Sequence, residues 1–267
     1  MTSQSRGPQD NLLVDMLQET KVVDLSHAFG LMTPLYEGFP QVRFEEIPEL
    51  HALGVQSHYY GFPGQCATHF DPPGHLCKGM ALIDEIPVRD LILSLVVIDA
   101  VEESQSNPDY MLLPKDIEGW EERYGRIPER SMVAMRTDWS LRWPDDNLLQ
   151  NRDEDGITHW PGWSLEVLEM LAQERNVVAI GHETIGTDGG EKTSRGSFQG
   201  QRYWHSEGKY QIELMSGLNQ PPAIGSLVIC GAPKPINGTG FPVRILALVP
   251  EIDVPSTCAH PGNPEEE

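Results

Sequence analysis

The sequence has few positive charges and no long apolar segment. It carries 19 Lys and Arg residues against 40 Asp and Glu residues, which gives a formal net charge of -21. A surface this acidic repels nucleic-acid phosphates and anionic lipid headgroups, so neither nucleic acid nor a membrane is expected as a partner. The longest apolar stretch, residues 91–100, is too short to span a bilayer, and residues 1–20 lack the apolar run of a signal peptide. We therefore expect a soluble, cytoplasmic protein.

The sequence also lacks the motifs of several large enzyme classes. Its four cysteines form neither a CxxC pair nor a dense disulfide framework, and buried free thiols are their simplest interpretation. No G-x-S-x-G sequence surrounds a serine, which argues against a serine hydrolase. No G-x-x-x-x-G-K or G-x-G-x-x-G phosphate loop is present, which argues against nucleotide chemistry.

Short apolar runs alternate along the chain with amphipathic segments. The runs read as buried strands and cover residues 22–26, 93–101, 132–136, 177–181, 226–230 and 243–249. The amphipathic segments predict helices over residues 11–17, 114–124 and 164–176. Strands in the majority, interleaved with helices, predict a mixed α/β or α+β fold.

The length of 267 residues suits one domain, and no repeat or low-complexity linker divides the chain. We expect this domain to cover residues 11–255, between a flexible terminus at 1–10 and a flexible acidic tail at 256–267. Residues 143–161 are acidic and irregular, and are expected to form a loop that could cover a pocket.

The densest group of chemically active side chains lies in residues 68–75, Thr-His-Phe-Asp-Pro-Pro-Gly-His. Alternate residues of an extended segment point the same way, so His69 and Asp71 can meet one ion. The two prolines stiffen the backbone beyond them, and Gly74 lets the chain turn to present His75. An imidazole beside a carboxylate suits zinc or manganese. Taken alone, this spacing fits polar residues in an exposed loop as well as it fits a metal site.

Further segments give this motif a context. They are residues 23–27 with the Thr-Pro pair at 33–34, and residues 83–87, 136–139, 181–188 and 211–214. In this order they resemble the cyclase family of metal-dependent hydrolases, which includes bacterial kynurenine formamidases and isatin hydrolases. The resemblance implies a swivelling β/β/α-type fold, a small-molecule substrate and assembly into homodimers or homotetramers.

The resemblance also implies roles for individual residues. His69 and Asp71 match metal ligands, and Glu213 matches a distal acidic ligand. His75 matches a catalytic base or a ligand of a second ion. His205 matches the family's late histidine ligand, although its spacing to Glu213 is short.

One position departs from the family pattern. The family usually has a histidine four residues before His69, and this sequence has Gln65 there. An amide oxygen is a weaker ligand than imidazole, so Gln65 as a ligand favours Mn²⁺ over Zn²⁺ and leaves open whether one ion binds or two. Tyr36, His58 and Phe62 are candidates for the pocket wall, although core packing is the commoner role of a single aromatic residue.

These observations predict a metal-dependent hydrolase that activates water to cleave an amide-like or ester-like bond of a small molecule, cyclic or open-chain, with His75 as the base. Three alternatives stay open. The chain could be an arylformamidase acting on N-formylkynurenine, or a lyase or true cyclase that uses the same residues. It could also be a non-catalytic, metal-free binding protein of the same fold.

Overall fold

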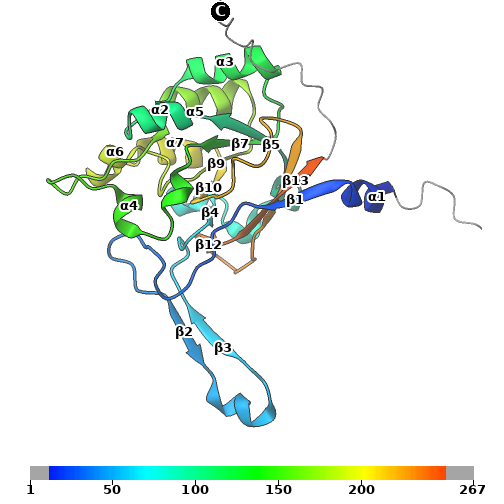
Figure 1. Ribbon diagram of the computed structural model, residues 1–267, viewed down its shortest axis with the longest axis vertical. Coiled ribbons are helices and arrows are strands. Elements are labelled where there is room, and N and C mark those ends of the chain that lie inside the picture. The colour runs from blue at the N-terminus through cyan, green and yellow to red at the C-terminus, as the bar shows by residue number, and fades with distance from the viewer. Residues whose placement is uncertain (1–11, 251–267) are drawn as a thin grey trace, which may run out of the picture.

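A nine-stranded mixed sheet forms the body of the computed structural model, which describes residues 12–250 (Figure 1). Its strands β5, β7, β9 and β10 run parallel, and the remaining neighbours pair antiparallel. In spatial order the strands are β1 (Thr20–Asp24), β13 (Arg244–Pro250), β11 (Ser226–Gly231), β5 (Ile92–Asp99), β7 (Ser131–Arg136), β9 (Ala179–His182), β10 (Tyr210–Glu213), β4 (His69–Asp71) and β12 (Phe241–Pro242). The strand-rich mixed α/β fold that the sequence predicts is confirmed.

Apolar side chains pack on both faces of this sheet. Along β5, Leu95 belongs to one buried cluster and the adjacent Val96 to another, as the alternation of side chains in a strand requires. The second cluster lies under three helices, α3 (Pro114–Tyr124), α5 (Leu165–Glu169) and α7 (Gln199–Ser206), and a π-helical turn, Met170–Glu174, continues α5. Shorter elements complete the body: α2 (Val101–Ser106), α4 (Asp146–Gln150), α6 (Gly190–Ser194) and the paired strands β6 (Met111–Leu112) and β8 (Gly162–Trp163).

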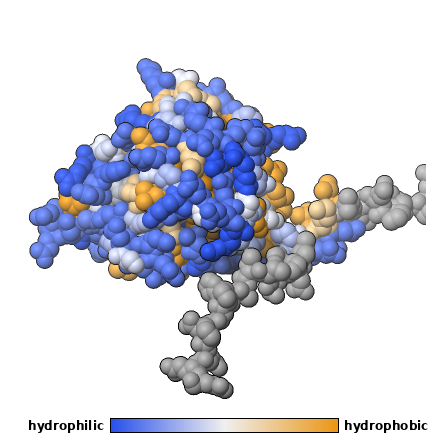
Figure 2. Space-filling model, turned by 90° about the horizontal axis from the view of Figure 1, so that it is seen from above, coloured by the Kyte–Doolittle hydropathy of each residue, from blue (hydrophilic) through white to orange (hydrophobic). Residues whose placement is uncertain are grey.

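A β-hairpin projects from the body (Figure 1). It consists of β2 (Arg43–Glu46), a 3-10 helix (Pro48–Leu53) and β3 (His58–Gly61). Its exposed side chains include Leu53, Val55, Tyr59 and Tyr60. A second exposed apolar surface belongs to α1 (Leu12–Gln18), which precedes the edge strand β1, and Figure 2 shows its orange side chains beside the grey terminus.

Most predicted elements are present within a few residues of their expected bounds. The structure corrects residues 143–161, because the cap at Asp145 starts the short helix α4 inside this expected loop. The predicted terminal segments 1–10 and 256–267 lie outside the described residues. Of the helices between residues 12 and 250, none has the length and apolarity needed to cross a membrane.

Candidate metal centre

Two neighbouring strands bring three of the predicted ligands together, His69, Asp71 and Glu213. β4 and β10 pair antiparallel, with Gln211 opposite Asp71 and Glu213 opposite His69. Because alternate residues of a strand share a face, these four side chains form a square patch on one face of the sheet. The intervening Phe70 points the other way and is buried in the apolar core. The polar patch therefore lies on the face of the sheet that α7 covers.

Three corners of this square fit a cation. Nε2 of His69 lies 3.5 Å from Oδ2 of Asp71 and 3.4 Å from Oε2 of Glu213, and all three residues are buried. Nδ1 of His69 lies 2.8 Å from the carbonyl oxygen of Ala67, so this nitrogen carries a hydrogen and donates it. In the neutral ring the lone pair of Nε2 therefore faces two carboxylates. Such an arrangement needs a positive charge between the three groups.

The pKa shifts of His69 and Asp71 also indicate that a positive charge belongs between these groups. Burial opposes a charge on His69, but the carboxylates of Asp71 and Glu213 outweigh it and raise the pKa of His69 well above its ordinary value. Burial likewise opposes ionisation of Asp71, but the nearby His69 and His75 lower the pKa of its carboxyl group. A divalent cation can supply the required charge in place of a proton. One imidazole nitrogen and two carboxylates are suitable donors for manganese or zinc.

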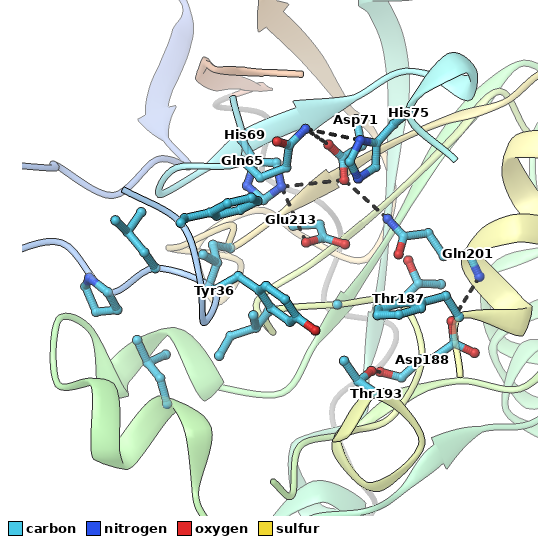
Figure 3. Close-up of a pocket in the computed structure, with 18 of the residues that line it drawn as sticks. Tyr36, Gln65, His69, Asp71, His75, Thr187, Asp188, Thr193, Gln201 and Glu213 are labelled. Carbon is cyan, nitrogen blue, oxygen red and sulfur yellow. Dashed lines mark hydrogen bonds and ion pairs between the residues drawn. The ribbon is translucent and has the colours of Figure 1, made fainter. Parts of the chain in front are cut away.

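Three glutamine side chains turn their NH2 groups towards these carboxylates, and Figure 3 labels two of them, Gln65 and Gln201. Nε2 of Gln65 lies 3.1 Å from Oδ1 of Asp71, and Nε2 of Gln201 lies 3.3 Å from Oδ2 of the same residue. Nε2 of Gln211 lies 2.6 Å from Oε1 of Glu213. Gln65, the candidate ligand through its amide oxygen, thus donates to a ligand in this structure, and its oxygen points away from Asp71 (Figure 3).

The two remaining candidate histidines lie beside this group. His75 is near the carboxylates, with Nδ1 3.3 Å from Nε2 of Gln65. His205, on α7, lies next to His75, with 6.2 Å between the ring centroids. His205 is fully buried and neither ring nitrogen has a hydrogen-bond partner, and burial lowers its pKa to about 4. The structure brings His205 close to His75 and not into the three-ligand group.

A cavity of about 180 Å³ opens beside the carboxylates. Tyr36, one of the candidates for the pocket wall, lines it and lies across it from His69 and Asp71 (Figure 3). Most of its wall is apolar and is formed by Pro34, Leu35, Tyr36, Phe39, Leu76, Leu149, Ile185, Phe198 and Leu214.

The structure places neither His58 nor Phe62 in this wall. His58 lies on β3 of the projecting hairpin, where it is exposed, because nearness to the motif in sequence does not bring this strand back to the cavity. Phe62 packs edge-on against Phe29 and Phe241, with centroid distances of 5.5 and 5.4 Å, in a separate apolar cluster.

Two residues close to the carboxylates were not among the sequence candidates. Gln201 lies four residues before His205, one turn earlier on the same face of α7, which is the signal that could have identified it. Asp188 lines the cavity and accepts hydrogen bonds from the backbone N–H groups of Gly200 (2.8 Å) and Gln201 (3.1 Å). Its carboxylate therefore holds the first turn of α7, and with it Gln201, beside Asp71.

His182, the last residue of β9, and the adjacent Glu183 have different surroundings, because neighbouring residues of an extended segment point to opposite faces. Nε2 of His182 lies 3.7 Å from Oε1 of Glu213, and Nδ1 accepts the indole N–H of Trp163 at 3.2 Å. Glu183 points away and accepts hydrogen bonds from the backbone N–H of Thr137 and from the hydroxyl groups of Thr137 and Ser140. Of these two residues, only His182 therefore faces the candidate metal centre.

Comparisons with known proteins find relatives over most of the chain. The model of the Cyclase family matches residues 23–189. An isatin hydrolase from Roseibium aggregatum is 32% identical over 247 residues, which cover 87% of this chain and 93% of the relative. The structure of isatin hydrolase A from Labrenzia aggregata bound to benzyl benzoate has a TM-score of 0.83 at 34% identity, and covers 90% of this chain and 99% of that one. An isatin hydrolase bound to the product analogue thioisatinate has a TM-score of 0.84 at 31% identity, with 92% and 100% covered.

Proposed function

This chain belongs to the cyclase family of metal-dependent hydrolases, and we propose that its substrate is a small planar cyclic amide of the isatin type. The observation that carries the proposal is the position of the three-ligand group at one end of a small, mostly apolar cavity. The flat aromatic part of such a substrate can pack against the apolar wall, while its amide carbonyl reaches the group formed by His69, Asp71 and Glu213. The reaction adds water across the C–N bond and gives a carboxylate and an amine.

The chemistry depends on a cation that His69, Asp71 and Glu213 would hold. When bound, such an ion makes water more acidic and polarises the scissile carbonyl group. We propose manganese in preference to zinc, because two of the three donors are carboxylates. The glutamine side chains beside them supply no further imidazole, which is the ligand that zinc would favour. The apolar wall excludes bulk water, which strengthens the interactions of the charged groups with the substrate carbonyl.

His75 is the proposed general base, because it lines the cavity beside the carboxylates. The NH2 group of Gln65 has two hydrogens, and its two oxygen acceptors, Oδ1 of Asp71 and the carbonyl of Thr239, both lie at 3.1 Å. Nδ1 of His75, at 3.3 Å, is a more distant third acceptor. The lone pair on Nδ1 of the neutral His75 ring is therefore not used by Gln65 and stays available as a proton acceptor. It can take a proton from the attacking water and return it to the departing nitrogen.

The proposal is tested with purified protein, metal-stripped and then supplied with Mn²⁺ or Zn²⁺. The substrates are isatin, a small lactone and N-formylkynurenine, and ring opening or deformylation is followed by absorbance. We expect ring opening of isatin that a chelator abolishes and Mn²⁺ restores. Preferential hydrolysis of N-formylkynurenine would support an arylformamidase instead. A protein that binds no metal and turns over no substrate would support the non-catalytic alternative.

A further inference from the structure

We infer that Thr187 and Gln211 form a positioning pair that determines which oxygen of Glu213 faces the cation. The inference rests on the metal site of the proposed function and extends it to two residues that are not ligands. Gln211 occupies the fourth corner of the square on β4 and β10, opposite Asp71 and two residues before Glu213. It is fully buried, so its amide has no water to satisfy it.

The contacts of Gln211 fix the orientation of its amide. Nε2 lies 2.6 Å from Oε1 of Glu213 and 3.5 Å from Oδ2 of Asp71. A reversed amide would place its oxygen against the Glu213 carboxylate, and two acceptors at that distance in a buried site repel each other. The amide oxygen must therefore face the other way, towards Thr187.

Thr187 holds the amide in this orientation. Its Oγ1 lies 2.5 Å from Oε1 of Gln211, and because a carbonyl oxygen only accepts, the hydroxyl group donates. Thr187 is itself fully buried, and its carbonyl oxygen accepts the backbone N–H of Trp163 at 2.9 Å. A hydrogen-bonded relay thus runs from the Thr187 hydroxyl through the Gln211 amide to one oxygen of Glu213.

This relay separates the roles of the two Glu213 oxygens. Oε1 accepts from Gln211, and Nε2 of His182 lies 3.7 Å from the same oxygen. Oε2 lies 3.4 Å from Nε2 of His69 and faces the centre of the ligand group. Because Oε1 is already engaged, Glu213 presents Oε2 to the cation as a preoriented ligand. Hydrogen bonds of this kind to a ligand are usually worth about 10- to 100-fold in metal affinity.

The test compares three variants by the dissociation constant of Mn²⁺, measured by titration calorimetry of the metal-stripped full chain. Thr187→Val removes the hydroxyl group and keeps the side-chain shape, whereas Thr187→Ser keeps the hydroxyl. Thr184→Val is the matched control, because Thr184 is buried on the same segment and donates at 3.2 Å to the carbonyl of Gly186, away from the carboxylates. We expect about 10- to 100-fold weaker binding in Thr187→Val, and binding within about threefold of wild type in the other two.

Unchanged affinity in Thr187→Val, or an equal loss in Thr184→Val, would overturn the inference. If circular dichroism shows that Thr187→Val does not fold, Gln211→Met tests the inference in the same assay. This variant keeps the length of the side chain and removes both the oxygen and the NH2 group of the amide. Excess Mn²⁺ should also restore kcat of Thr187→Val with KM unchanged. Because metal affinity is measured without substrate, failure of the native protein to open isatin would refute the substrate proposal and leave this inference standing.

Discussion

The buried imidazole of His205 should lower the free energy of unfolding of the metal-free protein in acid, and replacing His205 with leucine removes this effect. The ring is fully buried, neither nitrogen has a hydrogen-bond partner, and burial lowers its pKa from 6.5 to about 4. The nearby Asp71 opposes this shift and His75 adds to it. Between these two pH values the unfolded chain binds a proton at this position and the folded protein does not. The free energy of unfolding therefore falls as the pH falls from 6.5 towards 4.

The size of the effect follows from the two pKa values. Near pH 5 the unfolded imidazole is almost fully protonated and the folded one is mostly neutral. The proton linkage then costs the wild-type protein about 2 kcal/mol relative to neutral pH. A domain of this kind is usually stable by only about 5–15 kcal/mol, so a loss of this size is measurable.

The assay is urea unfolding in the presence of a chelator, near pH 7.5 and near pH 5. His205→Leu changes packing equally at both pH values, so the difference between the two measurements isolates the titration. We expect this difference to be about 2 kcal/mol smaller in His205→Leu than in wild type. His51→Leu changes an imidazole whose side chain is 44% exposed and serves as the control. If His205→Leu and wild type lose the same stability in acid, the buried, neutral state of His205 is refuted.

Three further predictions concern the site and the assembly. Asp71→Ala removes a charged ligand, so elemental analysis should show that bound metal and activity are lost together; a metal-free native protein with full activity would contradict this. His75→Ala should keep the metal and lower kcat by about two to four orders of magnitude, whereas a fall in metal content would make His75 a ligand. The exposed apolar side chains of α1 and of the projecting hairpin should drive self-association, and light scattering that shows a strict monomer at micromolar concentration would refute it.

The sequence was sufficient for features that depend on local pattern. The apolar side of residues 114–124 and the proline at its start predicted α3 at its observed bounds. The alternation in residues 69–71 predicted that His69 and Asp71 share a face, because side-chain direction in a strand depends only on the count of residues. Glu213 joined them through the family resemblance, and the register of β4 and β10 supplies the physical reason.

Features that depend on register and on the ends of short helices were not predictable from local pattern. Gln211 becomes part of the centre only because β10 pairs with β4 so that it lies opposite Asp71. The helix α7 has only two large apolar side chains, Tyr203 and Trp204, and its first turn is held from outside by the carboxylate of Asp188. Tertiary contacts of this kind override weak local preferences, so Gln201 was missed.

Glutamine in place of a family histidine at position 65 bears on how many ions the site holds. Asp71 could bridge two ions only if both of its oxygens were free, but Oδ1 accepts a hydrogen bond from Gln65. Oδ2, the other oxygen, faces Nε2 of His69 in the ligand group, and His205 remains outside this group. The group that faces Oδ1 is therefore an amide N–H of Gln65, which repels a second cation. We expect one ion per chain in wild type and, in Gln65→His, a shift of metal preference towards zinc, since imidazole is a better zinc ligand than an amide. Unchanged affinities for manganese and zinc in this variant would show that position 65 does not reach the ion.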